Sequence, residues 1–351
     1  MIIPLSLGTQ ELNLESIRIK TPARLHLSLI DLNGTRNRVD GSIGLAIQDP
    51  YFQILAQPSD QIEVCAQIYT ERAGRVIQKL KDYYSIPGLR VQLTSEMPQH
   101  SGFGSGTQLA LGIAAATNQI YQLGQSVHDL AVAVGRGGTS GVGVAAFEKG
   151  GFILDGGHKY PEQKSSLLPS AAVDGVAPPP LLLQSDFPDW QLLVIIPKCK
   201  HIAGDVEVNL FQTLCPQPKS MAERLSHLIL MQMLPAIFEA DLHTFGRALN
   251  EIQEFGWKRV EIDAQGGELQ QTLDFLWQNG AIGAGVSSWG PGIVAVGDDI
   301  GTLFQRTQNF LAETPFGGDC FITRANNSGA TIERVDTTIA GEPPDRYQEQ
   351  V

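Results

Sequence analysis

The chain has 351 residues and a formal net charge of −12, from 25 Lys and Arg against 37 Asp and Glu. An acidic chain lacks the basic face that nucleic acids require, and no apolar run reaches the roughly 18 residues that span a bilayer, so we expect neither nucleic-acid nor membrane partners. Four cysteines without a CxxC pair are typical of a reducing compartment, and we expect a cytoplasmic protein.

Strand and helix patterns are mixed along the first half of the chain. Residues 17–30 alternate apolar with polar, which predicts a strand with Arg24, His26 and Ser28 on one face. A charged loop is expected over 31–44. Further strand patterns lie at 45–57 and 89–97, and helical patterns at 66–84, 109–120 and 127–134.

The second half begins after a segment with little periodicity, 161–186, which we interpret as a surface loop or linker. Strands and helices then follow without strict βαβ alternation, which favours the α+β class. The strand patterns lie at 190–197, 281–297 and 319–335, and the helical patterns at 206–214, 219–237, 241–255, 266–278 and 300–312. We predict an N-terminal domain at 1–160, a linker at 161–188, a C-terminal domain at 189–340 and a loose tail at 341–351.

A glycine-rich segment, Gly102-Phe-Gly-Ser-Gly-Thr107, leads directly into a predicted helix. The N-terminus of a helix offers unpaired N–H groups and a partial positive charge, and glycines let the backbone wrap around an anion. On spacing alone, a turn without any ligand is an equal alternative. The segment is neither a Walker motif, because no Lys follows the last glycine, nor a dinucleotide fingerprint. The predicted phosphate-binding residues are Gly102, Phe103, Gly104, Ser105, Gly106 and Thr107.

Three segments together resemble the GHMP superfamily, named for its galactose, homoserine, mevalonate and phosphomevalonate kinases. Pro98 to Thr107 resembles its phosphate loop, Pro22-Ala-Arg-Leu-His-Leu its N-terminal strand motif, and Gly283 to Gly292 its C-terminal glycine motif. The resemblance extends over nearly the whole chain. It implies a GHMP-kinase-like two-domain fold, with a ribosomal-protein-S5-like N-terminal half and a ferredoxin-like C-terminal half.

One position departs from the kinases of this superfamily. Many of them carry a Ser-Gly-Ile/Val-Asp element whose Asp is the candidate base for the accepting hydroxyl, whereas this chain has Ser140-Gly-Val-Gly143. A glycine cannot accept a proton, which argues against simple phosphoryl transfer. Two alternatives stay open: an ATP-dependent kinase of a sugar or polyol, and a non-enzymatic nucleotide-binding regulator.

The full pattern resembles a narrower family, the β-ribofuranosylaminobenzene 5'-phosphate synthases of the tetrahydromethanopterin pathway. Members join 5-phosphoribosyl-1-pyrophosphate to a 4-amino- or 4-hydroxybenzoate and release carbon dioxide and pyrophosphate. The resemblance therefore implies a decarboxylating phosphoribosyltransferase that uses Mg²⁺ and forms a homodimer. The residues that carry it are Arg24-Leu-His26-Leu, Ile30-Asp31-Leu-Asn-Gly34, Arg38-Val-Asp40-Gly-Ser-Ile-Gly44-Leu, Gly104-Ser-Gly-Thr-Gln108, Arg136-Gly-Gly-Thr-Ser-Gly-Val-Gly143 and Ser287-Ser-Trp-Gly-Pro291.

This resemblance also implies roles for individual residues. Arginines would pair with phosphates or the aryl carboxylate, and Asp31 and Asp40 would bind Mg²⁺-pyrophosphate or ribose hydroxyls. The expected catalytic residues are Arg24, His26, Asp31, Arg38 and Asp40; Arg136 and Ser140 join the phosphate-binding set; and Ser287, Ser288 and Trp289 form a substrate lid. His201 and Glu207 lie near Gly204, where the resemblance implies contact with the substrate. The alternatives are local ion pairs in a solvated loop for Arg38 and Asp40, a structural role for His26, core packing for Trp289, and helix capping for His201 and Glu207.

Overall fold

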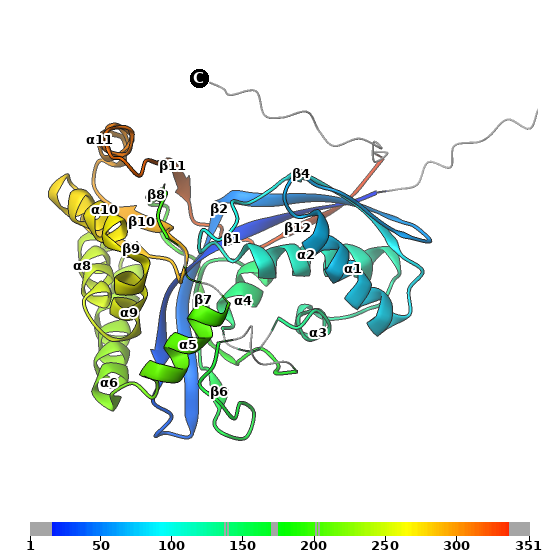
Figure 1. Cartoon of the computed structure of the whole chain (residues 1–351), viewed down its shortest axis with the longest axis horizontal. Coiled ribbons are helices and arrows are strands. Elements are labelled where there is room, and N and C mark those ends of the chain that lie inside the picture. The colour runs from blue at the N-terminus through cyan, green and yellow to red at the C-terminus, as the bar shows by residue number, and fades with distance from the viewer. Residues whose placement is uncertain are drawn as a thin grey trace, which may run out of the picture.

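Two β-sheets, each covered by helices, organise the computed structural model (Figure 1). The structure describes residues 16–136, 138, 140–169, 175–200, 202 and 204–336. The predicted tail at 341–351 and His201 lie outside the described residues. In the described part, no helix is long and apolar enough to cross a membrane.

The first sheet is built around a long hairpin of β1 and β2, in which Asp31 pairs with Asp40 across the turn. Its main path runs β12-β1-β2-β4-β3, with β5 and β6 also paired to β2 and β7 paired to β5. The strands are β1 (Ser16–Asp31), β2 (Arg38–Pro58), β3 (Ile62–Cys65), β4 (Leu89–Ser95), β5 (Phe152–Asp155), β6 (His158–Lys159), β7 (Leu181–Ser185) and β12 (Thr331–Val335).

Four helices, α1 to α4, cover one face of this sheet (Figure 1). Helix α2 lies close to the strands because it carries Gly112, where a Cβ atom would stand only 2.5 Å from Cδ1 of Ile54. Its apolar residues join those of β1 and β2 in one buried cluster. The helices are α1 (Thr70–Tyr84), α2 (Ser105–Ile120), α3 (Val127–Ala133) and α4 (Val142–Glu148).

The second sheet is antiparallel, with the order β11-β8-β10-β9. Its strands are β8 (Gln191–Pro197), β9 (Gly283–Val286), β10 (Ile293–Val296) and β11 (Gly318–Arg324). The helices of this half are α5 (Asp205–Leu214), α6 (Lys219–Leu228), the π-helical turn η2 (Ile229–Met233), α7 (Leu234–Phe238), α8 (Leu242–Gln253), α9 (Gly256–Gln265), α10 (Gly267–Gln278) and α11 (Ile300–Glu313). The mixed sheets and helices confirm the α+β prediction.

The structure differs from the predicted division of the chain in two places. The predicted linker 161–188 contains β7, and the predicted C-terminal domain contains β12, which returns to pair with β1 of the first sheet. Both strands are only five residues long, so their alternation is too short to reveal pairing with partners far away in the sequence. The charged loop predicted at 31–44 is also shorter, because β1 ends at Asp31 and β2 begins at Arg38.

Candidate active site

Two glycine-rich segments meet where the two halves of the chain pack together. Gly102 and Gly104 have positive φ angles of 82° and 72°, which glycine adopts without strain. Ser287, at the end of β9, donates a hydrogen bond of 2.8 Å to the carbonyl of Gly102. Gly290 is equally constrained, since a Cβ atom there would lie 1.9 Å from the amide nitrogen of Gly102. Both glycine-rich segments are therefore required for one close backbone contact.

This contact forms part of a cavity of about 260 Å³, which we call the phosphate-loop cavity. Helix α2 begins at Ser105, directly after Gly104, so its N-terminus lies at the cavity wall. The partial positive charge of a helix N-terminus favours anions there. The cavity is lined by residues 101–107, Arg24, Arg72, His100, Arg136, Ile202, Glu207, Ser288, Trp289 and Gly290. It thus contains every residue predicted in the phosphate loop.

Three arginines from three different elements line the phosphate-loop cavity. Arg24 lies on β1 and donates a hydrogen bond of 2.6 Å to the carbonyl of Gly102. Arg72 lies on α1, and a Cβ atom at Gly106 would stand 2.1 Å from one of its guanidinium nitrogens and 3.3 Å from one of Arg136. The sequence analysis singled out Arg24 and Arg136, but it missed Arg72, which belongs to no motif and is marked only by its place on an amphipathic helix.

Burial changes the electrostatics of these arginines. It lowers the pKa of both Arg24 and Arg136 to about 10, and it lowers the pKa of Arg72 as well. Arg72 adds to the effect at Arg136, whereas Glu261 opposes it at Arg24. All three groups remain cationic at neutral pH, and none forms a salt bridge with a carboxylate of the described residues. Partly buried cations without a carboxylate partner favour the binding of an anionic ligand.

A buried ion pair lies close to Arg24. Lys258 and Glu261, one turn apart on α9, are bonded to each other with side chains only 1% and 2% exposed. Lys258 also donates a hydrogen bond of 3.1 Å to the carbonyl of Val286 in β9. The pair therefore links α9 to the second sheet, and the charge of Glu261 acts on Arg24. The sequence analysis missed it, because a Lys and a Glu three positions apart on a helix usually form an exposed pair.

His26 lies next to this pair but is not among the residues that line the cavity. Burial, aided by Arg24 and Lys258, holds the pKa of His26 well below its usual value, so its ring is neutral at physiological pH. The backbone of His26, rather than its ring, contacts the segment after β9. Its amide donates a hydrogen bond of 3.0 Å to the hydroxyl of Ser287, and its carbonyl accepts one of 3.1 Å from the amide of Ser288. These bonds favour the alternative that His26 has a structural role.

Asp31, Arg38 and Asp40 lie at the other end of the hairpin, around a separate cavity of about 280 Å³. Asp31 lies seven positions after Arg24 on β1, which is roughly 20 Å at the usual rise of a strand. Asp40 is fully buried and pairs with Lys164 at 2.9 Å and with Nδ1 of His158 at 2.8 Å. The structure therefore does not bring these three predicted catalytic residues to the phosphate loop.

The carboxylate of Asp31 also has local partners, through one of its two oxygens. Oδ1 of Asp31 accepts hydrogen bonds from the amides of Asn33 and Gly34 at 2.7 and 3.2 Å, and Arg38 donates to the carbonyl of Gly157 at 3.2 Å. Asp40 pairs through both of its oxygens. The geometry therefore gives no support to Asp31 and Asp40 as magnesium ligands, because their carboxylates already have local partners.

Ser140 is part of a buried polar network rather than of the cavity wall. Its hydroxyl lies 2.8 Å from that of Ser42, which in turn donates to Asp155. Asp155 also accepts hydrogen bonds from the amides of Gly141 and Gly157 at 3.0 and 2.9 Å. Burial raises the pKa of Asp155 to about 6. Asp155 thus fixes the backbone that follows Arg136, a role that the sequence analysis did not predict.

Gly143, the position where many GHMP kinases have their base, lies on α4 against the phosphate loop. A Cβ atom there would contact Cγ2 of Thr107 at 3.0 Å, and the three atoms nearest to it all belong to Thr107. The carbonyl of Gly143 accepts a hydrogen bond of 2.8 Å from the side chain of Gln108. The position therefore faces the loop, and this chain provides no side chain there.

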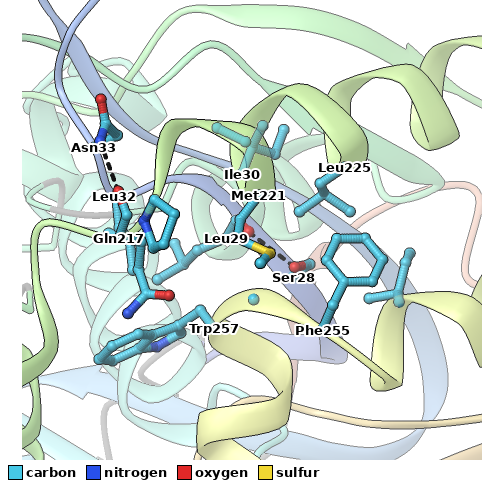
Figure 2. Close-up of a pocket in the computed structure, with 14 residues that line it drawn as sticks. Ser28, Leu29, Ile30, Leu32, Asn33, Gln217, Met221, Leu225, Phe255 and Trp257 are labelled. Atoms are coloured by element: carbon cyan, nitrogen blue, oxygen red, sulfur yellow. Dashed lines mark hydrogen bonds between the residues drawn. The ribbon is translucent and has the colours of Figure 1, made fainter.

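Trp289 lines the phosphate-loop cavity and also packs into an aromatic cluster. Its ring centroid lies 5.7 Å from that of Trp257 and 6.5 Å from that of Phe211, and only 7% of the residue is exposed. Figure 2 shows a small cavity beside this cluster, lined by Leu32, Trp257 and their neighbours. It measures about 20 Å³, which is room for roughly one water molecule and excludes a substrate.

Comparisons with known proteins agree on the fold. The family described as GHMP kinases N terminal domain matches residues 71–151. A homoserine kinase from Cytophaga hutchinsonii superimposes with a TM-score of 0.64 at 16% identity, covering 95% of this chain and 100% of that chain. A mevalonate kinase from L. major, solved with R-mevalonate, gives 0.63 at 16% identity over 88% and 96% of the two chains. The predicted GHMP fold is confirmed.

Two relatives are much more similar in sequence. The β-ribofuranosylphenol 5'-phosphate synthase of Archaeoglobus fulgidus is 40% identical over 319 residues, which cover 90% of this chain and 99% of the relative. The protein of the same name from Methanocaldococcus jannaschii is 38% identical over 329 residues, with 90% and 99% covered.

Proposed function

The chain belongs to the family of β-ribofuranosylphenol 5'-phosphate synthases, which are transferases, and we propose that it joins 5-phosphoribosyl-1-pyrophosphate to 4-hydroxybenzoate or 4-aminobenzoate. In this reaction a C-riboside forms, and carbon dioxide and pyrophosphate are released. The observation that carries the proposal is the set of three arginines around the N-terminus of α2, Arg24, Arg72 and Arg136, which have no carboxylate partner among the described residues.

The proposed phosphoribosyl donor carries a phosphate and a pyrophosphate, which need several cationic partners. Guanidinium groups suit both, because they can donate two parallel hydrogen bonds to phosphate oxygens. Arg72 and Arg136 lie side by side at Gly106, at the start of α2, and there they would neutralise the departing pyrophosphate. Stabilising charge that develops on a leaving group is the largest single contribution that most enzymes make.

The proposed chemistry also explains the absence of a base at position 143. Departure of pyrophosphate leaves an oxocarbenium ion at ribose C1, and the aromatic carbon that bears the carboxylate attacks it. Loss of carbon dioxide then restores the aromatic ring, so no hydroxyl has to be activated for attack on phosphorus. The non-polar faces of Trp289 and Ile202 would hold the aromatic ring beside the arginines.

Magnesium is expected with a pyrophosphate substrate, yet the protein side chains do not fit a resident magnesium site. Among the residues that the structure describes, no three His, Cys, Asp or Glu side chains are grouped so that they could hold a metal ion. Mg²⁺ commonly binds through substrate phosphates with only one or two carboxylates. We therefore infer that Mg²⁺ arrives bound to pyrophosphate, and we assign Asp31 and Asp40 no part in holding it.

The experiment is to incubate the purified protein with Mg²⁺, phosphoribosyl pyrophosphate and either benzoate. We expect carbon dioxide and pyrophosphate in equal amounts, and mass spectrometry should show the C-riboside. A parallel incubation with ATP and a panel of sugars and polyols tests the kinase alternative. No turnover of phosphoribosyl pyrophosphate, together with consumption of ATP, would overturn the proposal.

A further inference from the structure

One acidic side chain stands among the arginines of the phosphate-loop cavity. Glu207, in the first turn of α5, is the only carboxylate among the described residues that line it. It forms no hydrogen bond or ion pair with another residue of the described ranges, although Arg24, Arg72, Arg136 and His100 line the same cavity. A permanent negative charge would repel the anions that this cavity is built to bind, so a further role for Glu207 has to be sought.

The protonation of Glu207 is set by its surroundings. The first turn of a helix ordinarily favours the charged form of a carboxylate. Here burial outweighs that effect and, together with the charge of Glu261 on α9, raises the pKa of Glu207 to about 7. A group with a pKa near neutrality can both accept and return a proton in one catalytic cycle.

The two candidate acceptors differ in their need for such a group. The amino nitrogen of 4-aminobenzoate has a lone pair that can push electrons into the ring directly. The hydroxyl of 4-hydroxybenzoate becomes an equally strong donor only when its proton is removed. Resting on the proposed function, we propose that Glu207 is the general base that takes the phenolic proton of 4-hydroxybenzoate while the ring attacks the ribose.

The step balances in atoms and charge. The phenolic proton moves to the Glu207 carboxylate, and the electron pair of the O–H bond forms a quinoid C=O. The ring carbon that bears the carboxylate bonds to ribose C1, whose bond to pyrophosphate breaks with both electrons leaving on pyrophosphate. The bond to the carboxylate then breaks, its electrons restore the aromatic ring, and the proton returns from Glu207 to the phenolate oxygen.

Glu207 is better placed for this role than His100, the other proton acceptor that lines the cavity. The hydroxyl lies across the ring from the reacting carbon, which must face the phosphates, so the base should come from an element other than the phosphate loop. Glu207 is on α5, whereas His100 lies two residues before Gly102, in the loop segment itself. His26 is buried and does not line the cavity.

The test compares the two acceptors with Glu207→Gln, which keeps the shape of the side chain but cannot accept the proton. The loss of a general base costs about 10²-fold or more in rate. We expect kcat/KM to fall by about that factor with 4-hydroxybenzoate and by less than about threefold with 4-aminobenzoate. Asp205→Asn removes an exposed charge from the same helical turn and should leave both reactions unchanged.

A second series uses 4-hydroxybenzoates with fluorine beside the hydroxyl, which ionise more readily. The defect of Glu207→Gln should shrink as the hydroxyl becomes more acidic, a trend that a purely structural role cannot produce. Equal losses with both acceptors and no trend with fluorination would overturn the assignment of Glu207 while the synthase activity stands. A wild-type protein that is inactive with both acceptors would overturn the proposed function itself, and this inference with it.

Discussion

The hydroxyl of Ser287 donates a 2.8 Å hydrogen bond to the carbonyl of Gly102, although the two residues are 185 positions apart in the chain. The same carbonyl accepts a bond of 2.6 Å from Arg24. Ser287 also accepts a hydrogen bond from the amide of His26. These bonds tie the start of the phosphate loop to β1 and to the bend after β9, so the second sheet helps to set the shape of the anion site.

Gly102→Ala tests this contact. The new Cβ atom would lie 2.1 Å from the carbonyl oxygen of Ser287, which belongs to the backbone and cannot move aside cheaply. We expect the affinity for phosphoribosyl pyrophosphate to be lost, and calorimetric titration measures it. Gly124→Ala is the matched control, because Gly124 also has a positive φ, +65°, but has open space around it. The control should cost about 1 kcal/mol of stability and leave binding intact; equal binding by both variants would contradict the packing argument.

Arg72 is expected to bind phosphate, although no motif contains it. Arg72→Gln removes a cation that lies against the start of α2. A charge-assisted hydrogen bond contributes about 1.5–3 kcal/mol, so KM for phosphoribosyl pyrophosphate should rise about 10- to 100-fold. Arg75→Gln, on the same helix but exposed and paired with Glu71, should have little effect in the same steady-state assay. Equal KM values for the two variants would exclude Arg72 from the site.

We expect the buried ion pair of Lys164 with Asp40 to stabilise the folded protein. Lys164→Met leaves the carboxylate of Asp40 buried, with the ring of His158 still in hydrogen-bond contact with it. Breaking a buried ion pair costs about 3–5 kcal/mol, which urea unfolding measures. Lys159→Met, which removes an exposed partner of Glu162, should change the free energy of unfolding by less than about 1 kcal/mol. A small effect of Lys164→Met would show that the buried carboxylate does not need this partner.

Asp155 should make stability depend on pH in the direction opposite to that of a salt-bridged acid. Burial raises its pKa from 3.8 to about 6, so the folded protein binds more protons than the unfolded chain between these values. The contribution of Asp155 is therefore fully present below about pH 4 and is lost as the pH rises through about 6. Asp155→Asn should flatten this part of the stability profile, measured by urea unfolding at several pH values. An unchanged slope between pH 4 and 6 would contradict the assignment.

Most of the architecture followed from local patterns. Alternation predicted β1, the amphipathic pattern predicted α1, and the glycines before Leu109 predicted a loop at the start of α2. These features depend on side-chain periodicity and on backbone freedom, both of which are properties of short segments. The short strand β7 was missed, and the strand predicted at 319–335 did not reveal that β12 pairs with β1, because both strands pair with partners far away in the sequence.

The sequence by itself determined that a glycine-rich loop with GHMP motifs would lead into α2, because the required backbone conformation depends on residues close together in the chain. Only the tertiary structure decided which charges reach that loop. It placed Arg72 and Glu207, from two separate helices, in the cavity, and it left Asp31 and Asp40 at the far end of a long hairpin. The reason is physical: the distance between charges depends on how the helices and sheets pack, which no local pattern specifies.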